Sequence, residues 1–128
     1  MSRKRVLIVD DDPSMLEFLQ LHLESQNYDS LPVTDSITAL SEARKQRPDL
    51  IILDLGLPGG GGMVLLQRLQ GLPQLRTIPV IVLSARKRSV SEQPALDAGA
   101  AAFFQKPADP EQLLKKIREL LGESQEEP

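Results

Sequence analysis

Cysteine is absent from this chain, and aromatic residues make up only 3% of its 128 residues. Without thiols, the chain can form neither disulfide bonds nor thiolate metal sites. With so few aromatic rings, the core of the fold has to consist mainly of aliphatic side chains. The lack of cysteine also suits a reducing compartment, and we expect a cytoplasmic localisation.

Long hydrophobic runs are absent as well. The basic N-terminus, residues 1–5, is followed by only four apolar residues, fewer than a signal peptide or a membrane-spanning helix requires. Basic residues are not in excess, since the net charge is −3, which argues against a dedicated nucleic-acid binder. We therefore expect no membrane partner and no direct nucleic-acid partner, and we expect a monomer or a weak dimer.

What is present is the composition of an ordinary globular domain, 41% hydrophobic and 26% charged. A chain of this length is large enough to form one domain with its own core. We expect that domain over residues 4–121, followed by a disordered acidic tail over residues 122–128.

Five short apolar runs alternate with amphipathic stretches, which predicts an α/β fold with a parallel sheet. The second run contains Pro32, which cannot donate a ladder hydrogen bond and therefore belongs at a sheet edge. A doubly wound sheet of order 2-1-3-4-5 with five helices satisfies this constraint. The predicted strands are residues 5–9, 29–33, 49–53, 78–83 and 101–104.

Capping residues predict where the helices begin. The fourth helix contains Pro94, and taking Ser91 as its N-cap would place this proline in the first turn, where its missing N–H costs little. The last helix should end at Gly122. The predicted helix starts are Asp12 with Pro13, residue 36, the position after the loop 59–62, Ser91, and Asp109 with Pro110.

Carboxylates, a hydroxyl and a lysine follow the predicted strands. Asp10 and Asp11 follow the first strand, Asp54 the third, Ser84 the fourth and Lys106 the last. Because the carboxyl ends of parallel strands share one edge, these side chains should converge there. Neighbouring carboxylates repel each other and favour a bound cation, and Mg²⁺ prefers oxygen ligands. Acids with one lysine therefore indicate a site for a divalent metal and a phosphoryl group.

Four segments carry a family resemblance. They are Val9-Asp10-Asp11-Asp12-Pro13, Asp54-Leu55-Gly56-Leu57-Pro58, Leu83-Ser84-Ala85 and Lys106-Pro107. In this order and spacing they resemble the receiver domain of bacterial two-component response regulators, of which the chemotaxis regulator is the minimal form. The resemblance covers about residues 4–121 and implies a flavodoxin-like fold.

The resemblance implies a signalling module and not an enzyme, one that assists only its own phosphorylation and slow dephosphorylation. Asp54 matches the residue that accepts a phosphoryl group from a histidine kinase or a histidine phosphotransfer protein. Asp10 and Asp11 match the pair that holds Mg²⁺, for which Mn²⁺ could substitute, with Asp11 a direct ligand and Asp10 acting mostly through water. Asp54 and the carbonyl of Gly56 match the remaining metal ligands. Asp12 falls outside this pair and should only cap its helix.

Three further matches concern signalling. Lys106 matches the lysine that pairs with the phosphoryl group, and Ser84 matches the hydroxyl that turns toward it. Phe103 matches the switch aromatic that fills the space left by this hydroxyl. The output would reach a downstream protein through the face formed by the last strand and the two helices beside it.

Some positions depart from the family pattern. Phe103 has no hydroxyl, so switching has to work by packing alone. Residues 101–102 are alanines in place of a commonly acidic pair, which predicts an apolar corner on the output face. Gly56 and Arg86 occupy positions that tune dephosphorylation, yet Gly56 has no side chain to orient water and Arg86 cannot act as a base.

Other features have simpler explanations. The run Gly59–Gly62 lacks the Lys-Ser/Thr pair of a P-loop, so we interpret it as a flexible loop. His22 could be a phospho-donor but is better explained as a surface or boundary residue of a helix. The basic run Arg86–Arg88 is interpreted as a solvated loop that could meet an acidic partner.

Other functions have to be weighed against signalling. A phosphatase of the haloacid-dehalogenase type needs a second acid two residues after its nucleophile, where this chain has Gly56. A flavin-binding protein would find its phosphate repelled by the acidic strand ends and few aromatic residues to stack on its ring. A receiver that only shuttles or stores phosphate, without switching, remains an alternative.

Overall fold

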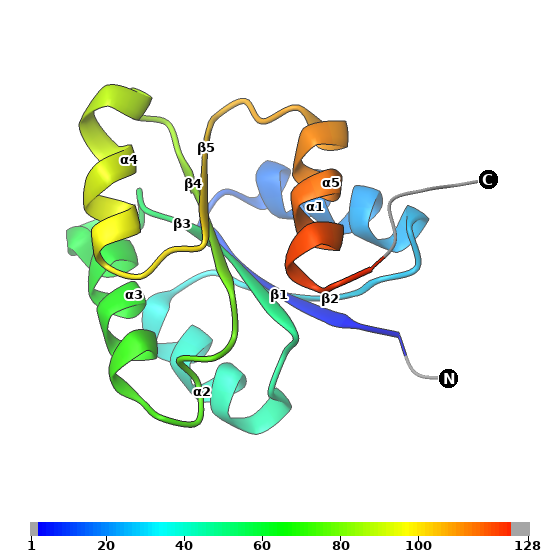
Figure 1. Cartoon of the computed structure of the whole chain (residues 1–128), viewed down its shortest axis with the longest axis horizontal. Coiled ribbons are helices and arrows are strands. Elements are labelled where there is room, and N and C mark those ends of the chain that lie inside the picture. The colour runs from blue at the N-terminus through cyan, green and yellow to red at the C-terminus, as the bar shows by residue number, and fades with distance from the viewer. Residues whose placement is uncertain (1–2, 124–128) are drawn as a thin grey trace.

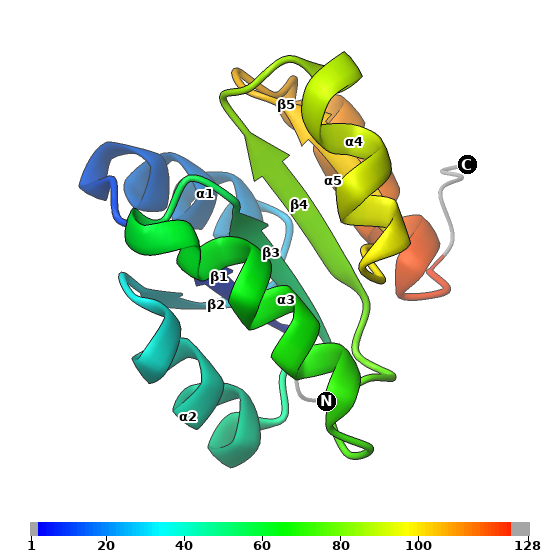
Figure 2. The same cartoon turned by 90° about the vertical axis from the view of Figure 1, so that its left-hand side faces the viewer.

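The computed structural model of the chain describes residues 3–123. Its backbone forms five parallel strands in the order β2-β1-β3-β4-β5, with helices on both faces of the sheet (Figures 1 and 2). The predicted fold class and strand order are therefore confirmed. The strands are Arg5–Val9 (β1), Asp29–Val33 (β2), Leu50–Asp54 (β3), Val80–Ser84 (β4) and Ala102–Gln105 (β5).

The helices alternate with the strands. They are Pro13–Ser25 (α1), Ser36–Gln46 (α2), Gly61–Gly71 (α3), Arg88–Asp97 (α4) and Pro110–Leu120 (α5), with a short 3₁₀ helix at Pro58–Gly60 (η1). No helix within residues 3–123 combines the length and the hydropathy needed to cross a bilayer.

The sheet separates two aliphatic layers, which alternate along β1. Helices α1 and α5 cover one face of the sheet, and α2, α3 and α4 cover the other (Figure 1). Val6 and Ile8 belong to the layer beneath α1 and α5, whereas Leu7 and Val9 belong to the layer beneath α2, α3 and α4. Pro32 lies on β2, which pairs only with β1, so its place at a sheet edge is confirmed. The strands β3 and β4 end one residue later than predicted, so Asp54 and Ser84 are the last residues of strands.

The predicted start of α4 is wrong. The helix begins at Arg88, so Ser91 is a buried residue within it and Pro94 lies in its interior. The first turn is supported by β5, because the side-chain oxygen of Gln105 accepts a hydrogen bond from the Arg88 N–H at 2.9 Å. This cap comes from a residue distant in the sequence, so a search for a local capping side chain could not find it.

Two other expectations need correction. Helix α3 begins at Gly61, so the glycine run forms η1 and the first turn of α3, and within η1 Gly59 has a φ of 67°. Ala102 is buried in the core, so only Ala101 is exposed at the corner that was expected to be apolar.

The C-terminal end of the described chain is held by contacts. Gly122 adopts a left-handed φ of 72° directly after α5. The Tyr28 hydroxyl then donates a hydrogen bond of 2.5 Å to the Glu123 carboxylate. The rest of the predicted tail, residues 124–128, lies outside the described residues, and the domain boundaries remain a prediction.

Gly62 shows how closely α3 approaches the end of β3. A Cβ atom on Gly62 would lie 2.6 Å from the Asp54 carbonyl oxygen and 2.6 Å from the Leu55 Cα. Both are backbone atoms, so neither can rotate out of the way. We expect Gly62→Ala to lower the free energy of unfolding by about 1–3 kcal/mol, even though alanine is the better helix former.

Denaturant unfolding of the purified variant checks this expectation. Gly71→Ala is the matched control, because a Cβ there meets no atom within 4 Å, and it should be neutral or slightly stabilising. If the two variants were equally stable, α3 could not approach the end of β3 as closely at Gly62 as the structure shows.

Candidate functional site

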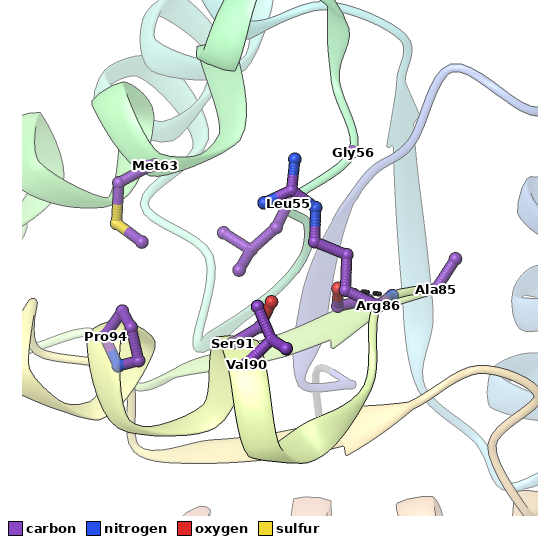
Figure 3. A pocket seen from close by; sticks show the side chains of 9 residues that line it. Leu55, Gly56, Met63, Ala85, Arg86, Val90, Ser91 and Pro94 are labelled. Atoms are coloured by element: carbon purple, nitrogen blue, oxygen red, sulfur yellow. Dashed lines mark hydrogen bonds between the residues drawn. The ribbon is translucent and has the colours of Figure 1, made fainter.

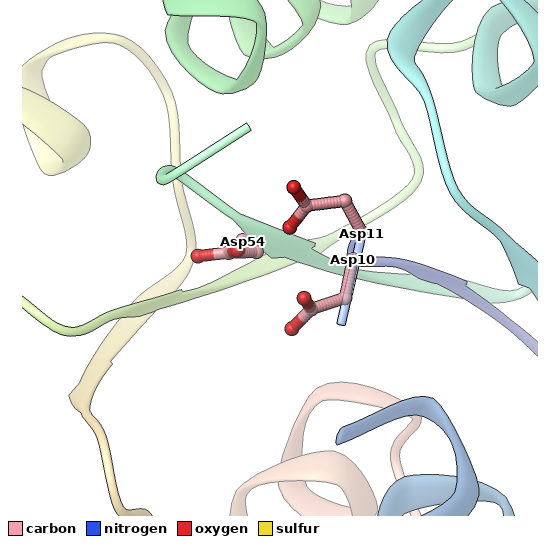
Figure 4. Close-up of side chains that lie close together, drawn as sticks. All are labelled: Asp10, Asp11 and Asp54. Carbon is pink, nitrogen blue, oxygen red and sulfur yellow. The ribbon is translucent and has the colours of Figure 1, made fainter. Parts of the chain in front are cut away.

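The carboxyl ends of β1 and β3 bring three carboxylates together. Asp10 and Asp11 follow β1, and Asp54 ends β3. One side-chain oxygen from each of these residues lies within 4.8 Å of the others (Figure 4). Oxygen donors at this spacing suit a hard divalent cation such as Mg²⁺.

Lys106 lies between two of these acids. Its Nζ atom is 2.9 Å from Asp10 Oδ2 and 3.4 Å from Asp54 Oδ1. The Lys106 backbone N–H donates to the Ser84 carbonyl at 2.7 Å, and this bond holds the backbone of Lys106 beside the end of β4. The structure thus brings together four of the predicted site residues, and one cation neutralises part of the acidic cluster.

The three acids differ in their exposure to solvent. Asp10 is 1% exposed and Asp54 is 6% exposed, whereas Asp11 is exposed. Burial raises the pKa of Asp10, as does the charge of Asp54, and these effects outweigh the hydrogen bonds from the Asp12 N–H and from Lys106. Burial alone would lower the pKa of Lys106, but its hydrogen bond to Asp10 and the charge of Asp54 raise it. The two carboxylates therefore favour the cationic form of Lys106, whereas burial disfavours the charged form of Asp10.

Backbone N–H groups hold the two buried carboxylates in place. Asp10 Oδ1 accepts from the Asp12 N–H at 3.0 Å, and Asp54 Oδ1 accepts from the Gly56 N–H at 2.9 Å. Asp12 itself caps α1, because its Oδ1 accepts from the Ser14 N–H at 3.0 Å. A Cβ on Gly56 would lie 3.3 Å from Asp54 Oδ1, so a side chain at this position would crowd this oxygen.

Ser84 lies at the site but its hydroxyl is engaged elsewhere. Its Oγ accepts a hydrogen bond from the Arg86 N–H at 3.1 Å, within the loop after β4. Phe103, on the neighbouring strand, is only 5% exposed, and the Arg88 guanidinium lies 5.5 Å from its ring centroid. The ring that was expected to move inward on activation is thus already buried.

Arg88 was interpreted as part of a solvated loop, yet it begins α4. Its guanidinium pairs with Glu92 at 2.6 Å, and its N–H is bound by Gln105. Its contacts therefore join the first turn of α4 to Phe103 and to β5. Sequence reasoning missed this role, because no local signal pairs a loop arginine with a strand aromatic.

A cavity of about 360 Å³ opens beside the site between α3 and α4 (Figure 3). Ser84 and Gly56 border it, and most of its other lining is apolar. The lining residues are Leu55, Gly56, Met63, Ser84, Ala85, Arg86, Val90, Ser91 and Pro94. Ala85 and Arg86 of this lining belong to the loop after β4.

His22 lies on α1, half-buried, with its ring edge against Phe18 at a centroid distance of 4.5 Å. This packing agrees with the boundary role that the sequence favoured over a phospho-donor role.

Sequence comparison relates this chain to known proteins. A family model described as the response regulator receiver domain matches residues 6–118. The DNA-binding response regulator MtrA of Mycolicibacterium smegmatis is 35% identical over 126 residues, which cover 98% of this chain and 54% of MtrA. The transcriptional regulatory protein KdpE of Mycobacterium tuberculosis is 40% identical over 113 residues, which cover 88% of this chain and 49% of KdpE. The chain thus spans about half the length of these curated relatives.

Solved structures with a similar fold come from the same family. A putative response regulator from Chloroflexus aurantiacus has a TM-score of 0.90 at 30% identity, covering 94% of this chain and 99% of that chain. The receiver domain of a sensor histidine kinase from Pseudomonas aeruginosa, solved with magnesium coordinated in its active-site cleft, has a TM-score of 0.86 at 26% identity, covering 94% and 99%. Neither the phosphatase nor the flavin alternative is favoured by these matches. The chain belongs to the receiver-domain family of two-component response regulators, whose members are signalling modules and not classical enzymes.

Proposed function

We propose that Asp54 accepts a phosphoryl group from a phosphohistidine on a histidine kinase or a histidine phosphotransfer protein. The observation that carries this proposal is the meeting of three carboxylates within 4.8 Å, two of them bound to Lys106. The receiver domain would extend over residues 4–121, and the exchange would take place in the cytoplasm.

The donor set fits Mg²⁺, with Mn²⁺ as a substitute. Asp10, Asp11, Asp54 and the carbonyl of Gly56 would hold the ion, with Asp11 a direct ligand and Asp10 acting mostly through water. When bound, the ion supplies positive charge that offsets the charge on the phosphoryl oxygens.

The side chains around Asp54 suit phosphoryl transfer. A carboxylate oxygen of Asp54 would attack phosphorus in line while the bond from phosphorus to the donor histidine nitrogen breaks, which leaves an acyl phosphate on Asp54. Lys106, which pairs with Asp10 and Asp54 before transfer, would then pair with the phosphoryl oxygens. Its charge would offset charge that develops during transfer, the main contribution of a protein to such a reaction.

The switch would start at Ser84. To reach the phosphoryl group, its hydroxyl has to leave the Arg86 N–H, which releases the loop before α4. Because Phe103 is already buried, the loop and not the ring would make the larger movement. Arg88 would carry this movement to Phe103 and to α4, and so to a downstream protein at the face of α4, β5 and α5.

Beryllofluoride, which stands in for the phosphoryl group, tests this proposal. With Mg²⁺ it should shift amide resonances throughout residues 84–106 of the labelled protein, well beyond the site. Ser84→Ala is the control, because it should still bind beryllofluoride at Asp54 yet lose most of the shifts in α4. Shifts confined to the neighbourhood of Asp10, Asp54 and Lys106 would instead favour a receiver that shuttles or stores phosphate.

A further inference from the structure

Helices α2 and α3 lie side by side on one face of the sheet (Figure 2). Side chains of both helices line a groove between them. Two adjoining hollows of about 180 and 290 Å³ form this groove, which is continuous because both are lined by Leu40 and Arg68. The groove contains none of the acids of the phosphoryl site. Its remaining lining residues are Ser36, Ile37, Arg44, Val64, Leu65, Gly71 and Leu72.

One end of the groove carries exposed apolar side chains. Ile37 is 83% exposed and Val64 is 45% exposed, and both line the same hollow. A single exposed leucine, such as Leu21 on α1, needs no explanation, but apolar side chains gathered around a hollow mark an interaction site.

Toward its other end the groove is cationic, with Arg68 where the two hollows meet and Arg44 in the second hollow. Arg44 and Arg68 are both exposed, and neither forms an ion pair with another residue of the described chain. Helix α3 has no acidic residue, and the one acid of α2, Glu42, already pairs with Lys45 at 3.7 Å. The two arginines therefore have no local counter-charge along the groove.

We propose that this groove docks an amphipathic helix of a partner protein, with an apolar anchor at the end of Ile37 and Val64 and carboxylates at the end of Arg44 and Arg68. The spacing supports a helix, because each arginine lies four residues beyond an apolar lining residue of its own helix, Leu40 or Val64. Four residues of helix rise about 6 Å, so a partner helix lying along the groove would carry its acid about one turn after its anchor. Apolar packing would give affinity, and the arginines would fix direction and exclude basic partners.

The probes are two synthetic helical peptides. The first carries a leucine followed by glutamates four and seven positions later, and its twin has lysine at both glutamate positions. Titration into the labelled receiver, followed by amide resonances, should give saturable shifts at Ile37, Leu40, Val64 and Arg68 with the acidic peptide only. This surface does not depend on the phosphoryl site, so a failure here leaves the phosphorylation of Asp54 untouched.

Exposed positions supply matched variants that should leave the fold intact. Ile37→Ser should weaken binding about fivefold and Arg68→Glu about tenfold. The controls are Leu21→Ser, which removes a different exposed apolar side chain, and Lys4→Glu, which reverses a distant charge, and both should stay within about twofold of the parent.

Three results would overturn the proposal. The lysine peptide could bind as tightly as the acidic one, or the shifts could fall outside the groove. Sedimentation could also show self-association of the receiver that Ile37→Ser and Arg68→Glu abolish, in which case a second copy of this chain is the occupant.

Discussion

Asp54→Asn should gain no phosphoryl group from acetyl phosphate under conditions in which the parent protein is converted. The amide cannot act as the nucleophile, and of the two buried acids that pair with Lys106, Asp10 is the less accessible, at 1% exposed against 6% for Asp54. Intact mass measurement reads the gain directly. The parent should also stop reacting in EDTA and recover with Mg²⁺ or Mn²⁺, because the acidic cluster would hold the required cation.

Asp97→Asn provides the matched control. This exposed aspartate is the last residue of α4 and accepts a hydrogen bond from Gln93 at 2.8 Å. Its loss should leave the phosphoryl gain unchanged. If Asp54→Asn still took up phosphate to the same extent as Asp97→Asn, the acceptor would be a different residue.

Much of this site could be predicted because it follows from the topology of the sheet. Apolar runs and a proline at an edge are local signals, and a parallel sheet brings the ends of its strands to one edge. Asp10, Asp54 and Lys106 therefore had to meet once the alternation of strands and helices was recognised. The distances between these side chains and their burial could be obtained only from the structure.

The missed features depend on contacts between residues distant in the sequence. The start of α4 rests on Gln105, and the contact of its first residue, Arg88, with the Phe103 ring joins the helix to β5. Local capping preferences instead indicated Ser91, which the fold buries. The groove between α2 and α3 is a similar case, since Ile37 and Val64 look like ordinary helix positions until the helices are placed side by side.

Lys106→Met should lower the free energy of unfolding in EDTA by about 2 kcal/mol near neutral pH. Removing one partner of a fully buried ion pair costs about 3–5 kcal/mol, and the lysine is 17% exposed, which places this case below that range. The substitution leaves Asp10 buried and repelled by Asp54 without a cation between them. Lys116→Met is the control, since Lys116 makes a surface pair with Glu119 at 3.0 Å and should contribute at most about 1 kcal/mol.

The deficit of Lys106→Met should shrink as the pH falls. Burial already raises the pKa of Asp10 in the folded protein above 3.8, and Lys106 works against this rise, so its removal raises the pKa further. Between the unfolded pKa and the raised folded pKa, the folded state binds more protons than the unfolded state, so stability increases as the pH is lowered through that window. Urea unfolding in EDTA at about pH 8 and about pH 5 should therefore show a smaller loss at the lower pH.

A second substitution separates charge from packing. Asp10→Asn combined with Lys106→Met removes both members of the pair at 2.9 Å, so it should recover most of the lost stability and its remaining deficit should no longer depend on pH. If instead the loss in Lys106→Met were the same at both pH values and persisted in the double variant, the lysine would stabilise the fold by packing alone. The ion pairs of Lys106 with Asp10 and Asp54 would then contribute nothing to the free energy of unfolding.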